Sequence, residues 1–335
     1  MTNPSVTARC QPSWQQELAD AISDPAELLR RLELPLDLLG PARAAAREFR
    51  LRVPEAYLAR MRPGDASDPL LRQVLPVDTE LESAEGYVRD PVGDLDAMTT
   101  PGLLHKYRGR ALLVTTGACA VHCRYCFRRH FPYGDANPAR EEWAEAIAYL
   151  AADDSIREVI LSGGDPMVLG NARLARLVDA LDAIPHISRL RIHSRLPVVL
   201  PSRVDAGLLD LLGGTRLKTV FVIHANHARE FDADVGSALA ALRGAGAQLL
   251  NQAVLLRGVN DSVDALAALS ETLFEHGVLP YYLHLLDPVS GARHFDVPEG
   301  EATRLIEAMR ARLPGYLVPR LVREIAGEAS KRPVG

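Results

Sequence analysis

The sequence predicts an α/β fold in which six parallel strands form part of a barrel. From residue 111 to residue 285, short β-rich runs alternate with amphipathic helical segments. The β-rich runs are continuously apolar, which is typical of parallel strands buried on both faces. Polar side chains follow nearly every run, whereas an open doubly wound sheet collects its ligand-binding groups at one switch point. The pattern therefore favours a partial (β/α)6 TIM-like barrel.

Each element of this barrel is assigned from its local pattern. The expected strands are 111–115, 158–161, 190–193, 219–224, 249–255 and 281–285. The expected helices between them are 138–152, 172–184, 205–212, 235–243 and 262–276. Gly244-Ala245-Gly246 follows a helix and precedes a strand, which is the reverse of the order in a dinucleotide-binding turn. It is interpreted as a helix stop.

The residues before the barrel lack this rhythm and predict a mainly helical extension. Ser23-Asp24-Pro25 places a polar cap before a proline, which is typical of a helix start, and Ala26 to Leu32 continues the helix. A second helix is expected after Val53-Pro54, to about Met61. We therefore divide the chain into an N-terminal extension, a barrel and a C-terminal segment, at 1–100, 101–290 and 291–335.

The charge balance excludes several classes of protein. The 38 basic and 43 acidic residues give a net charge of −5, whereas proteins that live on nucleic acid or anionic membranes carry an excess of basic residues. Residues 1–16 have no apolar signal core, and no stretch has the roughly 20 apolar residues of a membrane span. We therefore expect a cytoplasmic protein with no membrane partner and no direct nucleic-acid partner. Cys10, in the polar tail, is interpreted as a spare thiol.

The other three cysteines, Cys119, Cys123 and Cys126, have a C-x3-C-x2-C spacing directly after the first predicted strand. In a reducing compartment such a group favours a metal or redox site over disulfides. A structural zinc site takes four ligands, so His122 or His130 would have to complete it. An iron-sulfur cluster on three cysteines leaves one iron open to a small molecule, which suits an enzyme. The spacing alone leaves cluster, zinc and chance open.

The spacing of these cysteines and their position after the first strand resemble the motif of the radical S-adenosylmethionine (SAM) superfamily, in which three cysteines with this spacing bind a [4Fe-4S] cluster. A second segment, Leu161-Ser162-Gly163-Gly164-Asp165-Pro166, follows the second strand and is similar to the superfamily's glycine-rich motif. The resemblance implies that SAM chelates the open iron and that four residues bind SAM: Ser162, Gly163, Gly164 and Asp165. Glycines permit close approach of the backbone to a ligand, although the motif alone is also that of an ordinary βα turn.

Longer segments, from about Gly102 to the C-terminus, resemble the lysine 2,3-aminomutase family. These segments are Gly117 to Phe131, His193 to Arg203, Ile223 to His227, Leu255 to Ser262 and Gly315 to Pro319. The resemblance implies an isomerase that uses SAM and pyridoxal phosphate (PLP) to convert L-lysine to β-lysine, with flavodoxin or ferredoxin as the electron donor. The short chain and its ending, Arg323 to Lys331, are most similar to bacterial members that supply (R)-β-lysine, with a lysine ligase, for modification of elongation factor P.

Lys331 matches the family lysine that binds PLP as a Schiff base. Only three lysines are present, Lys106, Lys218 and Lys331, and arginine cannot replace lysine in this role because its guanidinium stays protonated. Without the resemblance, Lys331 would be interpreted as a solvated residue of the C-terminal tail. Lys218 has no proposed role.

Three further residues match the family's substrate site. Arg128 corresponds to the arginine that binds the substrate carboxylate, and a guanidinium can bind both carboxylate oxygens. Asp287 and Glu324 correspond to the two acids that hold the ε-ammonium group; the second is Asp in the longer members. Two acids indicate a cationic substrate, because a side-chain carboxylate, as in glutamate, would leave like charges unpaired.

The remaining candidates lie beside the predicted strands. In the family, three positions before the first strand contact the PLP phosphate, here Lys106, Tyr107 and Arg110. Four residues at strand ends are candidates to reach SAM or PLP: His193, Arg195, His224 and Asn226. Three alternative functions stay open: a radical SAM aminomutase acting on another amino acid such as glutamate, a PLP-free radical SAM enzyme, and a zinc-binding accessory to translation.

Overall fold

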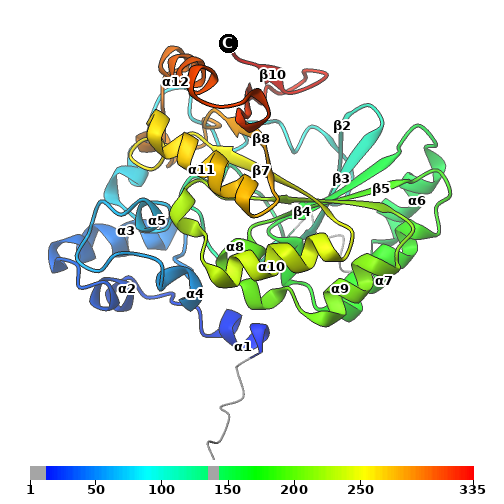
Figure 1. Ribbon diagram of the computed structural model, residues 1–335, viewed down its shortest axis with the longest axis horizontal. Coiled ribbons are helices and arrows are strands. Elements are labelled where there is room, and N and C mark those ends of the chain that lie inside the picture. The colour runs from blue at the N-terminus through cyan, green and yellow to red at the C-terminus, as the bar shows by residue number, and fades with distance from the viewer. Residues whose placement is uncertain (1–12, 135–142) are drawn as a thin grey trace, which may run out of the picture.

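A computed structural model describes residues 13–134 and 143–335, and its centre is a ten-stranded sheet whose strand order follows the chain (Figure 1). The strands from β3 to β9 are parallel. β1 and β2 pair antiparallel at one edge, and β10 does so at the other. Within the described part of the chain no pairing joins the two edges, so the barrel is partial, as predicted. Cys10 and the first residues of the helix expected at 138–152 lie outside the described residues.

All six predicted strands are confirmed, with ends within two residues of those expected. They are β3 (Arg110–Thr116), β4 (Glu158–Gly163), β5 (Arg189–Ser194), β6 (Lys218–Ile223), β7 (Gln248–Val254) and β8 (Leu279–His284). The register places apolar residues opposite each other, as with Leu113 and Leu161 on β3 and β4. Since all six strands run in the same direction, their carboxyl ends meet at one rim of the barrel.

The predicted helices cover the outer face of this sheet (Figure 1). They are α6 (Ala144–Ala152), α7 (Asn171–Asp182), α9 (Ala206–Gly214), α10 (Ala233–Gly244) and α11 (Val263–Glu275). The side chains of Asp205, Asp232 and Ser262 accept backbone N–H groups at the starts of α9, α10 and α11. These caps satisfy donors that the first helical turn leaves unpaired, so the helix starts are fixed by local sequence.

Four strands were not predicted: β1 (Met98–Thr100), β2 (Leu103–Tyr107), β9 (Arg320–Arg323) and β10 (Arg332–Pro333). β9 is parallel to β8, so the sheet has seven parallel strands and not six. β9 has four residues with arginine at each end, which is too short for an alternating pattern to be recognised. The last two strands matter for function, because Glu324 directly follows β9 and Lys331 directly precedes β10.

From residue 13 onward, the N-terminal extension contains five short α-helices: α1 (Trp14–Ala19), α2 (Pro25–Arg31), α3 (Leu39–Glu48), α4 (Glu55–Leu58) and α5 (Pro69–Arg72). α2 is the predicted helix, and the Asp24 side chain accepts the N–H of Ala26 at its start. α4 is shorter than predicted, and α3 was missed, as was α12 (Glu299–Arg312) near the C-terminus. No helix among the described residues is long and apolar enough to cross a membrane.

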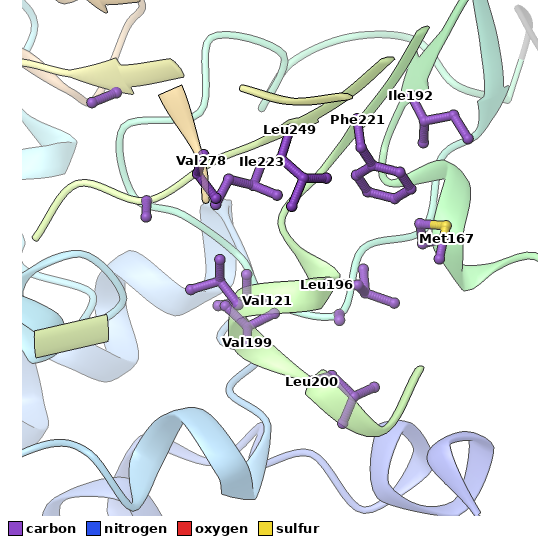
Figure 2. Close-up of a cluster of buried hydrophobic side chains, with 14 of the residues drawn as sticks. Val121, Met167, Ile192, Leu196, Val199, Leu200, Phe221, Ile223, Leu249 and Val278 are labelled. Carbon is purple, nitrogen blue, oxygen red and sulfur yellow. The ribbon is translucent and has the colours of Figure 1, made fainter. Parts of the chain in front are cut away.

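The apolar core lies between the sheet and its covering helices. Figure 2 shows side chains of β5 and β6, including Ile192 and Phe221, directed toward Leu196 and Val199 of the short helix α8 (Leu196–Val199). All four side chains are fully buried. Burial of a large apolar side chain stabilises the fold by about 1.5–3 kcal/mol. This packing fixes α8, which begins directly after the carboxyl end of β5.

A buried ion pair joins the N-terminal extension to the cysteine loop. The Arg124 guanidinium has no solvent exposure, and its Nε donates to Glu80 Oε1 at 2.8 Å. A second nitrogen of Arg124 donates to the carbonyl of Phe49 at 2.7 Å, and Arg129 also pairs with Glu80, at 2.8 Å. The loop between the cysteines is therefore held by residues far away in sequence.

We expect Arg124→Met to destabilise the protein by up to about 3 kcal/mol, the lower end of the cost of breaking a buried ion pair, because Arg129 still pairs with the Glu80 carboxylate. The measurement is the free energy of unfolding in a denaturant titration of the protein without cofactors. Arg30→Met is the matched control, since Arg30 pairs with Glu27 on the exposed surface. Equal stability losses for the two variants would contradict the role given to Arg124.

Candidate functional site

One cavity of about 410 Å³ opens at the carboxyl ends of the parallel strands. It brings together almost all of the site residues predicted from the sequence, although they come from segments across most of the chain. The residues that line it include Lys106, Tyr107, Arg110, Cys119, Cys123, Cys126, Arg128, Ser162, Gly163, Gly164, Asp165, His193, Arg195, His224, Asp287, Glu324 and Lys331. Asn226 does not line the cavity.

The three cysteine thiols face this cavity from the loop after β3. Burial, together with the neighbouring sulfurs, raises the pKa of Cys119 well above its usual value and the pKa of Cys126 to about 11. Thiolates gathered in such a place need a positive group, and a metal cluster supplies one because it binds cysteine in the deprotonated form. The donor set therefore fits an iron-sulfur cluster with one iron left open.

The two histidines considered as zinc ligands point elsewhere. His122 Nδ1 lies 2.9 Å from the carbonyl of Arg50, and His130 Nε2 lies 3.2 Å from the carbonyl of Ser290. Within residues 13–134 and 143–335, no three His, Cys, Asp or Glu side chains are grouped to hold a single metal ion. In a [4Fe-4S] cluster each cysteine binds a different iron, so convergence on one point is not required.

The glycine-rich turn after β4 packs on the backbone of the cysteine loop. The Gly164 N–H donates to the carbonyl of Thr116 at 2.6 Å, and a Cβ at Gly164 would lie 2.2 Å from the carbonyl oxygen of Ala118. Gly163 has φ +124°, a conformation that other residues rarely adopt. Glycine is therefore required here by contact between two loops, in addition to any approach of the backbone to a ligand.

Asp165 links this turn to the end of β5. Its Oδ1 accepts the N–H of Met167 at 3.0 Å, and its Oδ2 accepts the N–H of Arg195 at 2.7 Å. Burial raises the pKa of Asp165 to about 6, against the effect of these hydrogen bonds. Both carboxylate oxygens are thus engaged within the protein, and the side chain positions two of the loops that line the cavity.

Five charged side chains form a chain of alternating sign along one wall of the cavity. Arg128 Nε lies 2.6 Å from Asp94, and Asp94 lies 2.6 Å from Lys106 Nζ. Lys106 Nζ lies 3.1 Å from Glu324, which also pairs with Lys331. Sequence reasoning missed Asp94 because it lies in an irregular loop of the N-terminal extension. The importance of Asp94 follows only from the need of two buried cations, Arg128 and Lys106, for an anion between them.

The two lysines of this chain differ in their free hydrogen-bonding capacity. Lys106 Nζ has three acceptors, Asp94, Glu324 and the carbonyl of Val92, which match the three N–H donors of an ammonium group. Lys331 has one partner, Glu324, among the described residues. Lys331 is therefore the amine with capacity for a ligand. The expectation that Lys106 contacts a phosphate is not supported by this geometry.

Three residues were expected to bind the PLP phosphate, and Arg110 is the one among them that has a positive charge without an ion-pair partner among the described residues. Its guanidinium lies over the ring of Tyr107, 4.6 Å from the centroid, and has no ion pair with another described residue. Burial and the nearby charge of Glu324 raise the pKa of Tyr107, so the phenol stays neutral and can donate a hydrogen bond. A cation and a phenol on one side of the cavity fit a phosphate group.

The two acids predicted to bind the ε-ammonium group, Asp287 and Glu324, have opposite electrostatic environments. Burial opposes ionisation of Glu324, but the charges of Lys331 and Lys106 outweigh it and lower its pKa to about 2. Burial and the charge of Glu324 raise the pKa of Asp287 to about 7. Asp287 Oδ1 is buried and has no hydrogen-bond partner among the described residues. A buried acceptor without a partner fits a cationic ligand group.

The strand-end residues divide between the cavity and its support. His193 faces the cavity, burial lowers its pKa, and its buried Nε2 has no partner in the described part of the chain. His224 Nε2 lies 2.9 Å from the hydroxyl of Tyr125. Asn226 is fully buried and donates to Tyr125 and Gln73, so it supports the cavity from behind and does not reach it.

Comparison with known proteins agrees with this geometry. Residues 113–269 match the Radical SAM superfamily model. The chain is 48% identical to the L-lysine 2,3-aminomutase of Escherichia coli K12 over 96% of this chain and 94% of that protein. It is 48% identical to the L-lysine 2,3-aminomutase of Haemophilus influenzae, over 96% of both chains.

A longer relative is also similar. The chain is 33% identical to the L-lysine 2,3-aminomutase of Clostridium subterminale, over 96% of this chain and 77% of that protein. Similarity over nearly the whole length includes the extension, the barrel strands and the C-terminal segment. With its radical SAM region and these relatives, the chain belongs to the L-lysine 2,3-aminomutase family.

Proposed function

We propose that this protein is a radical SAM, PLP-dependent isomerase that converts L-α-lysine to β-lysine. The observation that carries the proposal is the meeting, in one cavity, of three cysteines, an available lysine amine and two carboxylates of opposite environment. The cysteines suit the cluster, the amine suits PLP, and the carboxylates suit a cationic side chain. No other site residue is needed to distinguish this function from the alternatives.

The cluster end of the cavity supports initiation of the reaction. When bound, a reduced [4Fe-4S] cluster and SAM supply the radical that removes hydrogen from the substrate. Cys119, Cys123 and Cys126 would hold the cluster, and the turn at Gly163-Gly164 would form the adjoining wall for SAM. Ser162 and Asp165 flank this turn and belong to the same assignment. The residues themselves fix the reactants and exclude water, so catalysis depends on positioning.

A second group of residues in the cavity supports the second cofactor. When bound, PLP carries the migrating amino group. Lys331 would hold it covalently, and Tyr107 and Arg110 would bind its phosphate. His193, with its unpaired Nε2, is a donor or acceptor for a polar atom of PLP or SAM. Lys106 contributes through Glu324 and Asp94, which it keeps in place.

The substrate would be held at both ends. Arg128 is fixed by Asp94 and also donates to Ser162 at 3.1 Å, which leaves part of its guanidinium for the α-carboxylate. Asp287 and Glu324 would bind the ε-ammonium group. A substrate with a carboxylate there, such as glutamate, would face two acids, and this disfavours the glutamate alternative.

We further propose that the product is (R)-β-lysine, that it serves elongation factor P through a lysine ligase, and that flavodoxin or ferredoxin supplies the electron in the cytoplasm. This part rests on the near-complete overlap of the chain with the Escherichia coli and Haemophilus influenzae relatives, and on the resemblance of Arg323 to Lys331 to the ending of the short bacterial members. Chiral analysis of the product tests the stereochemistry. Transfer of β-lysine to elongation factor P by the ligase tests the biological role.

The purified protein, reconstituted without oxygen with iron, sulfide, PLP, SAM and a reductant, is expected to convert L-lysine to β-lysine. Product is measured by chromatography with mass detection, with SAM omitted as a control. A fully loaded protein that leaves lysine unchanged but isomerises glutamate would overturn the substrate assignment.

Lys331→Arg is expected to abolish the visible absorbance of lysine-bound PLP, because a guanidinium cannot form the linkage while it retains the charge beside Glu324. Absorbance after incubation with PLP and desalting is the measurement. Lys218→Arg is the matched control, since Lys218 is exposed at the start of β6. Full absorbance in Lys331→Arg would show that another amine binds PLP.

Lysine affinity is expected to rise from about pH 6 to about pH 8, because Asp287 titrates near pH 7 and only its ionised form pairs with an ammonium. Glu324 remains ionised throughout this range, and burial lowers the pKa of His284 to about 3, so neither contributes. The dissociation constant is measured calorimetrically without SAM, and Asp287→Asn should remove the rise. An unchanged profile in that variant would disprove the assignment.

A further inference from the structure

Arg195 is a charged side chain in contact with a cysteine of the cavity. Its Nη1 nitrogen lies 2.7 Å from Cys123 Sγ. Arg195 is only 6% exposed and follows β5 directly, where Asp165 accepts its backbone N–H. Arg195 was a sequence candidate to reach SAM or PLP, and in the structure it lines the cavity with its charge beside a sulfur.

A network of buried groups holds the guanidinium in this position. Nη1 also donates to the hydroxyl of Tyr125 at 2.7 Å. Nη2 donates to Gln73 at 2.6 Å, to Tyr57 at 3.0 Å and to Glu230 at 3.1 Å. The two terminal nitrogens therefore make five contacts, and the orientation of the fork is fixed from several elements. The buried Nε has no partner among the described residues and remains a donor for a ligand in the cavity.

Glu230 is the counter-charge of Arg195 and pairs with a different nitrogen from the one that contacts the sulfur. Glu230 has no exposure, and its Oε1 accepts the backbone N–H groups of Asn226 and His227 at 2.8 and 3.1 Å. Its Oε2 faces Arg195 Nη2, whereas Nη1 faces Cys123. The arginine charge is thus closer to the sulfur than the compensating carboxylate is.

We propose that Arg195 sets the reduction potential of the cluster through Cys123 Sγ, with Glu230 as the opposing charge. This inference rests on the proposed function in one respect, that the three cysteines hold a [4Fe-4S] cluster. Hydrogen bonds to the sulfurs and net charge are the means by which proteins adjust cluster potentials. Arg195 supplies both at the same atom, and it acts as a positioning residue because it contacts a ligand of the cluster.

The direction of the effect follows from the charges. Reduction adds one electron to a cluster that already carries three thiolates, so a nearby positive charge stabilises the reduced state more than the oxidised state. Arg195 therefore raises the potential and makes reduction easier. Glu230 is negative, and it lowers the potential from a greater distance. Burial strengthens both effects because little water screens them.

The test is the midpoint potential of the reconstituted cluster, followed by electron paramagnetic resonance without SAM, PLP or lysine. Arg195→Met should make one-electron reduction at least tenfold less favourable, a shift of at least about 59 mV to lower potential. Arg195→Lys keeps the charge and should recover most of the lost potential. Glu230→Gln keeps an acceptor for the backbone and should shift the potential in the opposite direction.

Arg229→Met is the matched control, because Arg229 is the sequence neighbour of Glu230 but pairs with Asp68, away from the sulfurs. Its potential should match that of the unaltered protein. Iron and sulfide contents verify that each variant contains a complete cluster. If Arg195→Met does not take up a cluster, the midpoint potential of Glu230→Gln tests the proposal. A shift to higher potential supports it, and an unchanged or lower potential contradicts it.

Different results would contradict the cluster assignment and the role of Arg195. An unaltered protein that takes up zinc, or no [4Fe-4S] cluster, would refute the cluster assignment and this proposal with it. A complete cluster whose potential is the same in Arg195→Met and Glu230→Gln, or shifts in the same direction in both, would overturn the role of Arg195 while leaving the proposed function intact.

Discussion

The structure depends on the compensation of charge inside one cavity. Isolated charges are costly in a buried place, so each must have a partner of opposite sign. The chain from Arg128 through Asp94, Lys106 and Glu324 to Lys331 meets this requirement with members from the N-terminal extension, the barrel and the C-terminal segment. Its formation requires that all three regions be folded together, so the site is assembled only when the whole chain is.

Asp287 is the exception to this pairing of charges, and it indicates where a ligand is expected to bind. Every other acid in the cavity wall faces a cation or a backbone N–H group, but Asp287 has a buried oxygen without a partner in the described residues. A buried polar atom without a protein partner needs an explanation such as a catalytic role, a water molecule or a ligand, and Asp287 lines the cavity. The buried Nε2 of His193 belongs to the same cavity wall. In this cavity the unpaired atoms are the positions open to a ligand, and the paired atoms hold the surrounding side chains in place.

The sequence predicted the six strands β3 to β8, and its candidate site residues line the cavity with one exception, because apolar runs and motif spacing are local signals. It did not predict Asp94, β1, β2, β9 or β10, and the exception is Asn226, which it placed in the site. Asp94 has no local signal, since its importance arises from two cations brought to it by folding. Asn226 does follow a strand, but its amide is used by Tyr125 and Gln73. The end of a strand identifies the rim of a barrel, not the direction of each side chain.

The structure shows how the few lysines of the chain differ in their contacts within this cavity. Two of the three lysines face it, and both contact Glu324, so composition alone cannot choose between them. Hydrogen bonding can, because the three donors of Lys106 are all used and those of Lys331 are not. Lys106 is held by three acceptors and stabilises the negative charges of Asp94 and Glu324. Lys331 has one partner, Glu324, and can give up that contact to bind a ligand. The chemistry proposed for Lys331 therefore depends on Lys106 remaining where it is.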